Sequence, residues 1–127
     1  PAQMARAEAA IARSAARDPA AGAALQESVE TLQTWVALHP RDVLAWTLLS
    51  QCAEPLGLKL RAIRAEAEAH AAQGDLLGAI DRLRAGQRLT RTGKVDFVEA
   101  SIIDARLREL ESIRRELMKN NREAEQP

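Results

Sequence analysis

The chain has 127 residues, the size of one domain, and its 18 acidic and 18 basic side chains cancel to zero net charge. A neutral chain gives no reason to expect a nucleic-acid or anionic-membrane partner, and no apolar run reaches the ~18 residues of a membrane span. Alanine makes up about a fifth of the residues, with one Phe, two Trp and no Tyr, so good helix formers predominate and predict an all-α fold.

The chain carries a single cysteine, Cys52, which excludes an internal disulfide and a cysteine-based metal cluster. We expect this thiol to be a small core residue. No charged stretch followed by an apolar one, the pattern of a targeting signal, is present. A prediction of where the protein is located therefore has to rest on a family resemblance.

Glycine and proline divide the chain into segments of helical length. The intervals from Pro40 to Gly57 and from Gly57 to Gly74 are both 17 residues, and two of them give 34, the period of the tetratricopeptide repeat. The breaks predict about six antiparallel helices, over residues 3–17, 20–38, 42–54, 58–73, 76–90 and 96–119.

Aspartates stand at most of these breaks and predict helix starts. Asp96 has Glu99 three residues later, which resembles a capping box, and Gly74 is free to adopt the left-handed conformation that ends a helix. Pro19 fits the first position of a helix. The expected N-cap residues are Asp18, Asp42, Asp75 and Asp96.

The last predicted helix carries an apolar stripe made of Ile103, Leu107, Leu110 and Leu117, with Ile113 beside it. On its outer side the four-residue spacing predicts two ion pairs within the helix, Asp104–Arg108 and Glu111–Arg115. We expect this long helix to cap the open end of the array, because terminal repeats need a cover. A partner-binding or dimerising stripe is the alternative.

Part of the tetratricopeptide signature is present. Trp46 and Leu49 keep the first positions, and the place of Trp46 at a large site of the repeat predicts a packed side chain rather than an exposed binding aromatic. A better unit places Ala67 at the small site and His70 at the aromatic site. This predicts a repeat-like core over residues 22–90, in which helix 58–73 packs against the helix on either side. His70 is expected to fill an aromatic slot between helices rather than bind a metal, since a zinc site needs three or four ligands.

One helical face is the candidate partner-binding surface. In the register of the repeat, this face points away from Ile63. Repeat proteins of this architecture present their concave groove on that side, and such a groove could bind an extended peptide or a helix of a client. The alternative is an ordinary solvated face. The face comprises Leu44, Thr47, Gln51, Glu54, Arg61, Arg64 and Glu68.

Three stretches carry a closer resemblance: "HPRDVLAW", "LRAIRAEAEAHAAQGDLLGAIDRLRAGQRL" and "DFVEASIIDARLREL". Together they resemble the C-terminal helical-repeat region of bacterial M48-family zinc metalloproteases of the cell envelope. In that family a His-Glu-x-x-His helix and a downstream Glu hold the zinc, all in the N-terminal catalytic part. This chain has no such motif, and its two histidines, His39 and His70, are followed by Pro and Ala.

The resemblance implies a non-catalytic protein–protein interaction module in the periplasm or cell envelope. Its partner would be a protein or peptide client, or its own protease domain, and zinc is expected only in the missing catalytic part, with no cofactor in this chain. A stand-alone tetratricopeptide-like adaptor is the alternative, and a chain with hydrolase activity of its own is a third hypothesis.

Overall fold

A computed structural model describes residues 1–93 and 96–126, and all regular structure within these ranges is helical, which confirms the all-α prediction. Within these described residues, six α-helices and one short 3-10 turn follow one another, close to the predicted ranges. They are α1 (Ala2–Ala15), α2 (Ala21–Leu38), α3 (Val43–Ala53), η1 (Glu54–Leu56), α4 (Lys59–Ala72), α5 (Leu76–Leu89) and α6 (Phe97–Glu125).

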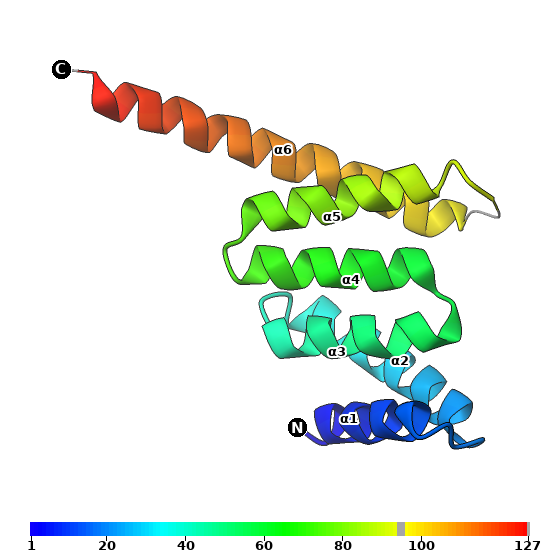
Figure 1. The fold of residues 1–127 in the computed structure, drawn as a ribbon. Helices are drawn as coiled ribbons and strands as arrows, with labels where there is room; N and C mark the ends of the chain where they lie inside the picture. Colours follow the sequence, from blue (N-terminus) through cyan, green and yellow to red (C-terminus); the bar gives the residue numbers. More distant parts are fainter. Residues whose placement is uncertain (94–95, 127) are drawn as a thin grey trace.

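The helices form a stack in which each packs against the next along the chain. Figure 1 shows α3, α4 and α5 as layers one above another, with α1 beneath them and α2 crossing obliquely. Helix α6 crosses the far side of α5 and runs on past its end (Figure 1). No helix in the described ranges has both the length and the apolar character needed to cross a bilayer.

Helix α4 belongs to two separate hydrophobic clusters. Ala62, Ala65 and Ala69 recur at helical spacing and pack with α1, α2 and α3, whereas Leu60 and Ala67 pack with α5 and α6. Alanine side chains allow two helix axes to approach closely. The prediction that this helix packs on both neighbours is therefore confirmed.

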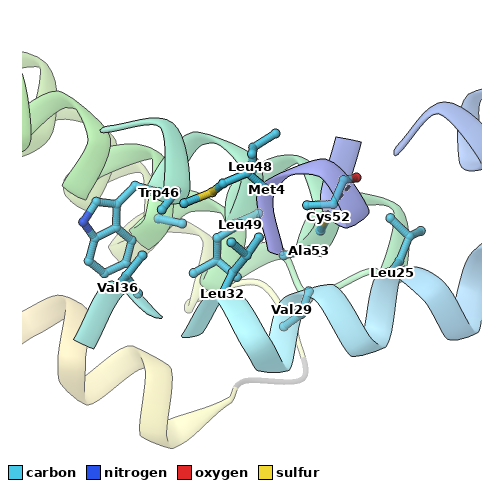
Figure 2. Packing of buried hydrophobic residues seen from close by; sticks show 14 of the residues in the cluster. Met4, Leu25, Val29, Leu32, Val36, Trp46, Leu48, Leu49, Cys52 and Ala53 are labelled. Atoms are coloured by element: carbon cyan, nitrogen blue, oxygen red, sulfur yellow. Dashed lines mark hydrogen bonds between the residues drawn. The ribbon is translucent and has the colours of Figure 1, made fainter. Parts of the chain in front are cut away.

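The first cluster lies between α1, α2 and α3, and Figure 2 shows its side chains converging from these helices. Leu32, Leu49 and Cys52 are fully buried there. The core position predicted for Cys52 is confirmed, and burial raises the pKa of its thiol to about 11. Trp46 is packed as predicted, with its indole N–H donating to the Pro40 carbonyl at 2.9 Å.

The joints on either side of α4 share one geometry. Gly57 and Gly74 have left-handed backbones, with φ of 75° and 82°. At the second joint the Gly74 N–H donates to the Ala71 carbonyl at 3.0 Å, and the Asp75 N–H donates to the His70 carbonyl at 2.8 Å. These bonds form a Schellman motif, which satisfies carbonyls that the helix end leaves open.

The same motif ends α1, but a non-glycine residue occupies the left-handed position. Arg17 has φ of 57°, and the backbone N–H groups of Arg17 and Asp18 close the motif at 3.0 and 2.9 Å. The sequence placed this break one residue later, at Asp18. An L-residue strains a left-handed backbone, which glycine adopts freely.

Three of the four predicted aspartate caps are confirmed. The carboxylates of Asp42, Asp75 and Asp96 each accept from the backbone N–H three residues later, at 3.0, 2.9 and 3.1 Å. The prediction for Asp18 is wrong. Its carboxylate accepts from the Ala20 N–H at 2.9 Å and shapes the turn, while α2 begins only at Ala21, so the proline also precedes the helix.

The final helix is longer than predicted, since it continues from residue 119 to Glu125. Its first half buries Ile103, Leu107 and Leu110 against the second cluster, as the apolar stripe predicted. Its second half leaves Ile113 and Leu117 exposed. The covering role predicted for this helix therefore falls on its first half.

The joint with glycine in the left-handed position and the joint with arginine there predict opposite effects of substitution on stability. Gly74→Ala should lower the free energy of unfolding by about 1 kcal/mol, because no atom lies within 4 Å of the added Cβ and the backbone cost acts alone. Arg17→Gly should raise it by about 0.5–1 kcal/mol by removing the same strain. Urea denaturation measures both, and effects of the same sign would contradict the shared motif.

Candidate functional site

The α4 part of the predicted partner face is bound to α6 by a nearly buried ion pair. The Arg64 guanidinium donates through Nε and Nη2 to the two carboxylate oxygens of Glu99, at 2.7 and 3.1 Å. The side chains are 12% and 5% exposed. A fork-to-fork pair with so little solvent is strong and sets the geometry of both partners.

A second ion pair lies further along the same two helices. Arg106 of α6 donates through Nε to both oxygens of Glu68 at 3.0 Å, and its Nη2 lies 2.9 Å from one of them. Burial acts to lower the pKa of Arg106, but the hydrogen bonds and charge of Glu68 outweigh it, so the pKa is raised. The guanidinium therefore stays charged.

Arg61 connects the same region to α2. Its Nη1 donates to the Gln33 side-chain oxygen at 3.0 Å, and its Nε lies 3.7 Å from Glu99. That Nε is buried and makes no hydrogen bond to any residue that the structure describes. The Arg64 guanidinium also lies 6.0 Å from the centre of the Trp46 ring, so these contacts join α2, α3, α4 and α6. We call the hydrogen-bonded and charged residues among them the polar clasp: Gln33, Arg61, Arg64, Glu68, Glu99 and Arg106.

The α3 part of the predicted face is open. Leu44 is 50% exposed, and Gln51 and Glu54 are also exposed. Thr47 is half-buried and its hydroxyl donates to the Val43 carbonyl at 2.9 Å. Among the residues that the structure describes, no hydrogen bond or ion pair connects these four to the charged residues of α4, so the seven predicted residues form two rows.

Sequence reasoning missed the α6 half of the clasp. The capping box predicted at Asp96 forms only in one direction, because the Glu99 carboxylate turns away from the cap to Arg64. The opposite signs of Arg64 and Glu68 on α4, and of Glu99 and Arg106 on α6, are visible in the sequence. Nothing in that spacing reveals that the two helices meet.

Both ion pairs predicted within α6 are wrong. The carboxylate of Asp104 accepts from the Gln87 amide at 2.8 Å, and Glu111 pairs with Arg84 at 3.1 Å. Both partners are on α5, which lies close alongside because Gly86 has no side chain and a Cβ there would approach Ile103 to 3.1 Å. Asp104 and Glu111 thus bind the neighbouring helix α5.

The position predicted for His70 is also wrong. Its side chain is 34% exposed, and its Nδ1 lies 2.9 Å from the second carboxylate oxygen of Asp75, the N-cap of α5. It therefore supports the joint at Gly74 rather than filling an aromatic slot. Within residues 1–93 and 96–126, no three potential His, Cys, Asp or Glu ligands gather around a common point.

Asp42 holds the joint between α2 and α3 in a similar way. While one carboxylate oxygen caps α3, the other accepts from the Trp35 indole N–H at 2.8 Å. The Trp35 bond and the cap lower the pKa of Asp42 below its ordinary value of 3.8. Trp35 is half-buried, and its ring centre lies 3.9 Å from that of His39.

Searches against protein-family models, curated proteins and solved structures find no match to this chain.

The buried pair predicts a large effect of neutralising one carboxylate. Glu99→Gln should lower the free energy of unfolding by about 2 kcal/mol, because Arg64 then keeps its charge without a compensating partner. Glu66→Gln is the matched control. It breaks the more exposed pair with Arg82 and should cost less than about 1 kcal/mol. If urea denaturation gave equal losses of unfolding free energy for the two variants, the buried pair would stabilise the protein no more than an exposed pair does.

The Asp42 bond predicts a pH effect. Because the folded-state pKa is lowered, the stabilisation is fully present above the unfolded value of 3.8 and is lost as the pH falls through the folded value. Trp35→Phe removes the indole N–H donor, whose hydrogen bond is the largest cause of the lowered pKa. The variant should be less stable by about 1 kcal/mol at pH 7 and should lose less stability than the wild type in acid. Parallel acid titrations of the two proteins would contradict this role.

Proposed function

We propose that this chain is a non-catalytic protein–protein interaction module of the tetratricopeptide-like type. The single observation that carries the proposal is the regular stacking around α4. Two Schellman joints stand 17 residues apart at Gly57 and Gly74, and the helix between them packs on both sides. Helix pairs stacked in this way form extended surfaces that bind peptides and helices.

The surface offered to a partner is the open row on α3 and the first residue of η1: Leu44, Thr47, Gln51 and Glu54. It combines an exposed leucine with polar side chains that make few contacts of their own. The charged residues of α4 are already engaged by α6, so they shape the stack and leave binding to α3. The partner in this proposal is a protein or peptide client, or the chain's own protease domain.

The resemblance to the M48 repeat region extends the proposal to the whole protein. In this view the chain is the C-terminal part of a zinc peptidase of the periplasm or cell envelope, and the zinc belongs to the catalytic part alone. A stand-alone adaptor is the alternative. The upstream gene sequence separates them: a His-Glu-x-x-His segment supports the peptidase, and its absence favours the adaptor.

The open row predicts where a partner touches the protein. A photoreactive amino acid placed at Leu44 or Gln51 of the natural full-length protein should form a discrete crosslink in its host cell. The same amino acid at Glu8 on α1, which is also exposed, should not. Equal crosslinking at both places, or none at α3, would rule out this face.

A further inference from the structure

A groove of about 520 Å³ lies between α5 and α6. Four of the eight residues that line it are arginines, of which three come from the α5 side and one from α6. None of the lining residues is aromatic, and two are acidic. The charged residues of this basic groove are Arg84, Arg88, Arg91, Arg108, Asp104 and Glu111.

The acidic residues of the basic groove do not neutralise most of its arginines. Glu111 pairs with Arg84, and Asp104 accepts from an uncharged amide. Within the described part of the chain, Arg88, Arg91 and Arg108 form no ion pair. Elsewhere on the same two helices, Arg82 of α5 and Arg106 of α6 each lie within 4.0 Å of a carboxylate oxygen.

The spacing of these arginines suits a particular ligand shape. Arg84 and Arg88 are four residues apart, which places them one turn apart on one face of α5, about 6 Å along its axis. Arg91 follows three residues later, in the turn after Leu89. Arg108 faces them from α6 across the groove. Guanidinium groups bind carboxylates through two parallel hydrogen bonds, and a helix with acidic residues at the same steps presents carboxylates at matching intervals.

We propose that the basic groove binds an acidic helical segment of a partner protein, with carboxylates at steps of three and four residues. The inference rests on the proposed interaction function but uses a different surface from the α3 row. A nucleic acid fits less well, because no aromatic side chain lines the groove for base stacking.

The test is fluorescence anisotropy with the 127-residue chain and a labelled 15-residue helical peptide that carries glutamate at steps of three and four in an alanine–glutamine background. The matched peptide has glutamine at those positions. We expect the acidic peptide to bind at least tenfold more tightly, and its affinity to fall as salt rises.

Variants locate the binding. Arg88→Gln/Arg108→Gln should weaken binding of the acidic peptide at least fivefold, while Arg6→Gln/Arg13→Gln, which removes two exposed arginines from α1, should change it less than twofold. All four substitutions are at exposed positions, so the helical circular dichroism spectrum should stay unchanged. Glutamine is used because it removes the charge without opposing the dipole at the end of α5.

Three results would overturn the proposal: equal losses in the two double variants, no preference for the acidic peptide, or tighter binding of a 15-nucleotide single strand or of phosphatidylglycerol vesicles. The crosslinking experiment on α3 is read independently. Crosslinks at Leu44 with no peptide binding would reject the groove alone, and peptide binding without those crosslinks would reject the α3 face alone.

Discussion

The stack depends on a constraint that α4 has to satisfy on two sides at once. Its alanines at 62, 65 and 69 must be small enough for α3 to lie close, and Leu60 and Ala67 must at the same time complete the cluster of α5 and α6. A helix with one apolar face would bury only one of these surfaces. Because the chain is rich in alanine, α4 is narrow enough to be packed on both faces and still carry charges between them.

The charges of α4 are used for positioning. Between its two apolar faces, Arg64 and Glu68 reach past α5 to Glu99 and Arg106, which fixes where α6 crosses the stack. Apolar packing alone would tolerate sliding of α6, whereas a bidentate pair has one good geometry. Because the clasp engages the charges of α4, the two surfaces proposed for partners are the open row and the basic groove beside α5.

Local sequence patterns predicted what local physics decides. The six helices, the aspartate caps at 42, 75 and 96, the left-handed Gly74 and the buried Trp46 follow from rules that span only a few residues. The two ion pairs predicted within α6 fail for a different reason, because they depend on which helix lies alongside. Asp104 and Glu111 bind α5 instead of their own helix, and the α4 half of the partner face meets α6.

The central claim is that α4 joins both clusters into one cooperative structure, and native-state hydrogen exchange tests it most directly. The amides of α4 should be the most protected in the chain, and α3 and α5 should open only in global unfolding. The free energy of opening from exchange should then equal the free energy of unfolding from urea denaturation. Separate opening of α5 and α6, with α4 no better protected than α1, would contradict it.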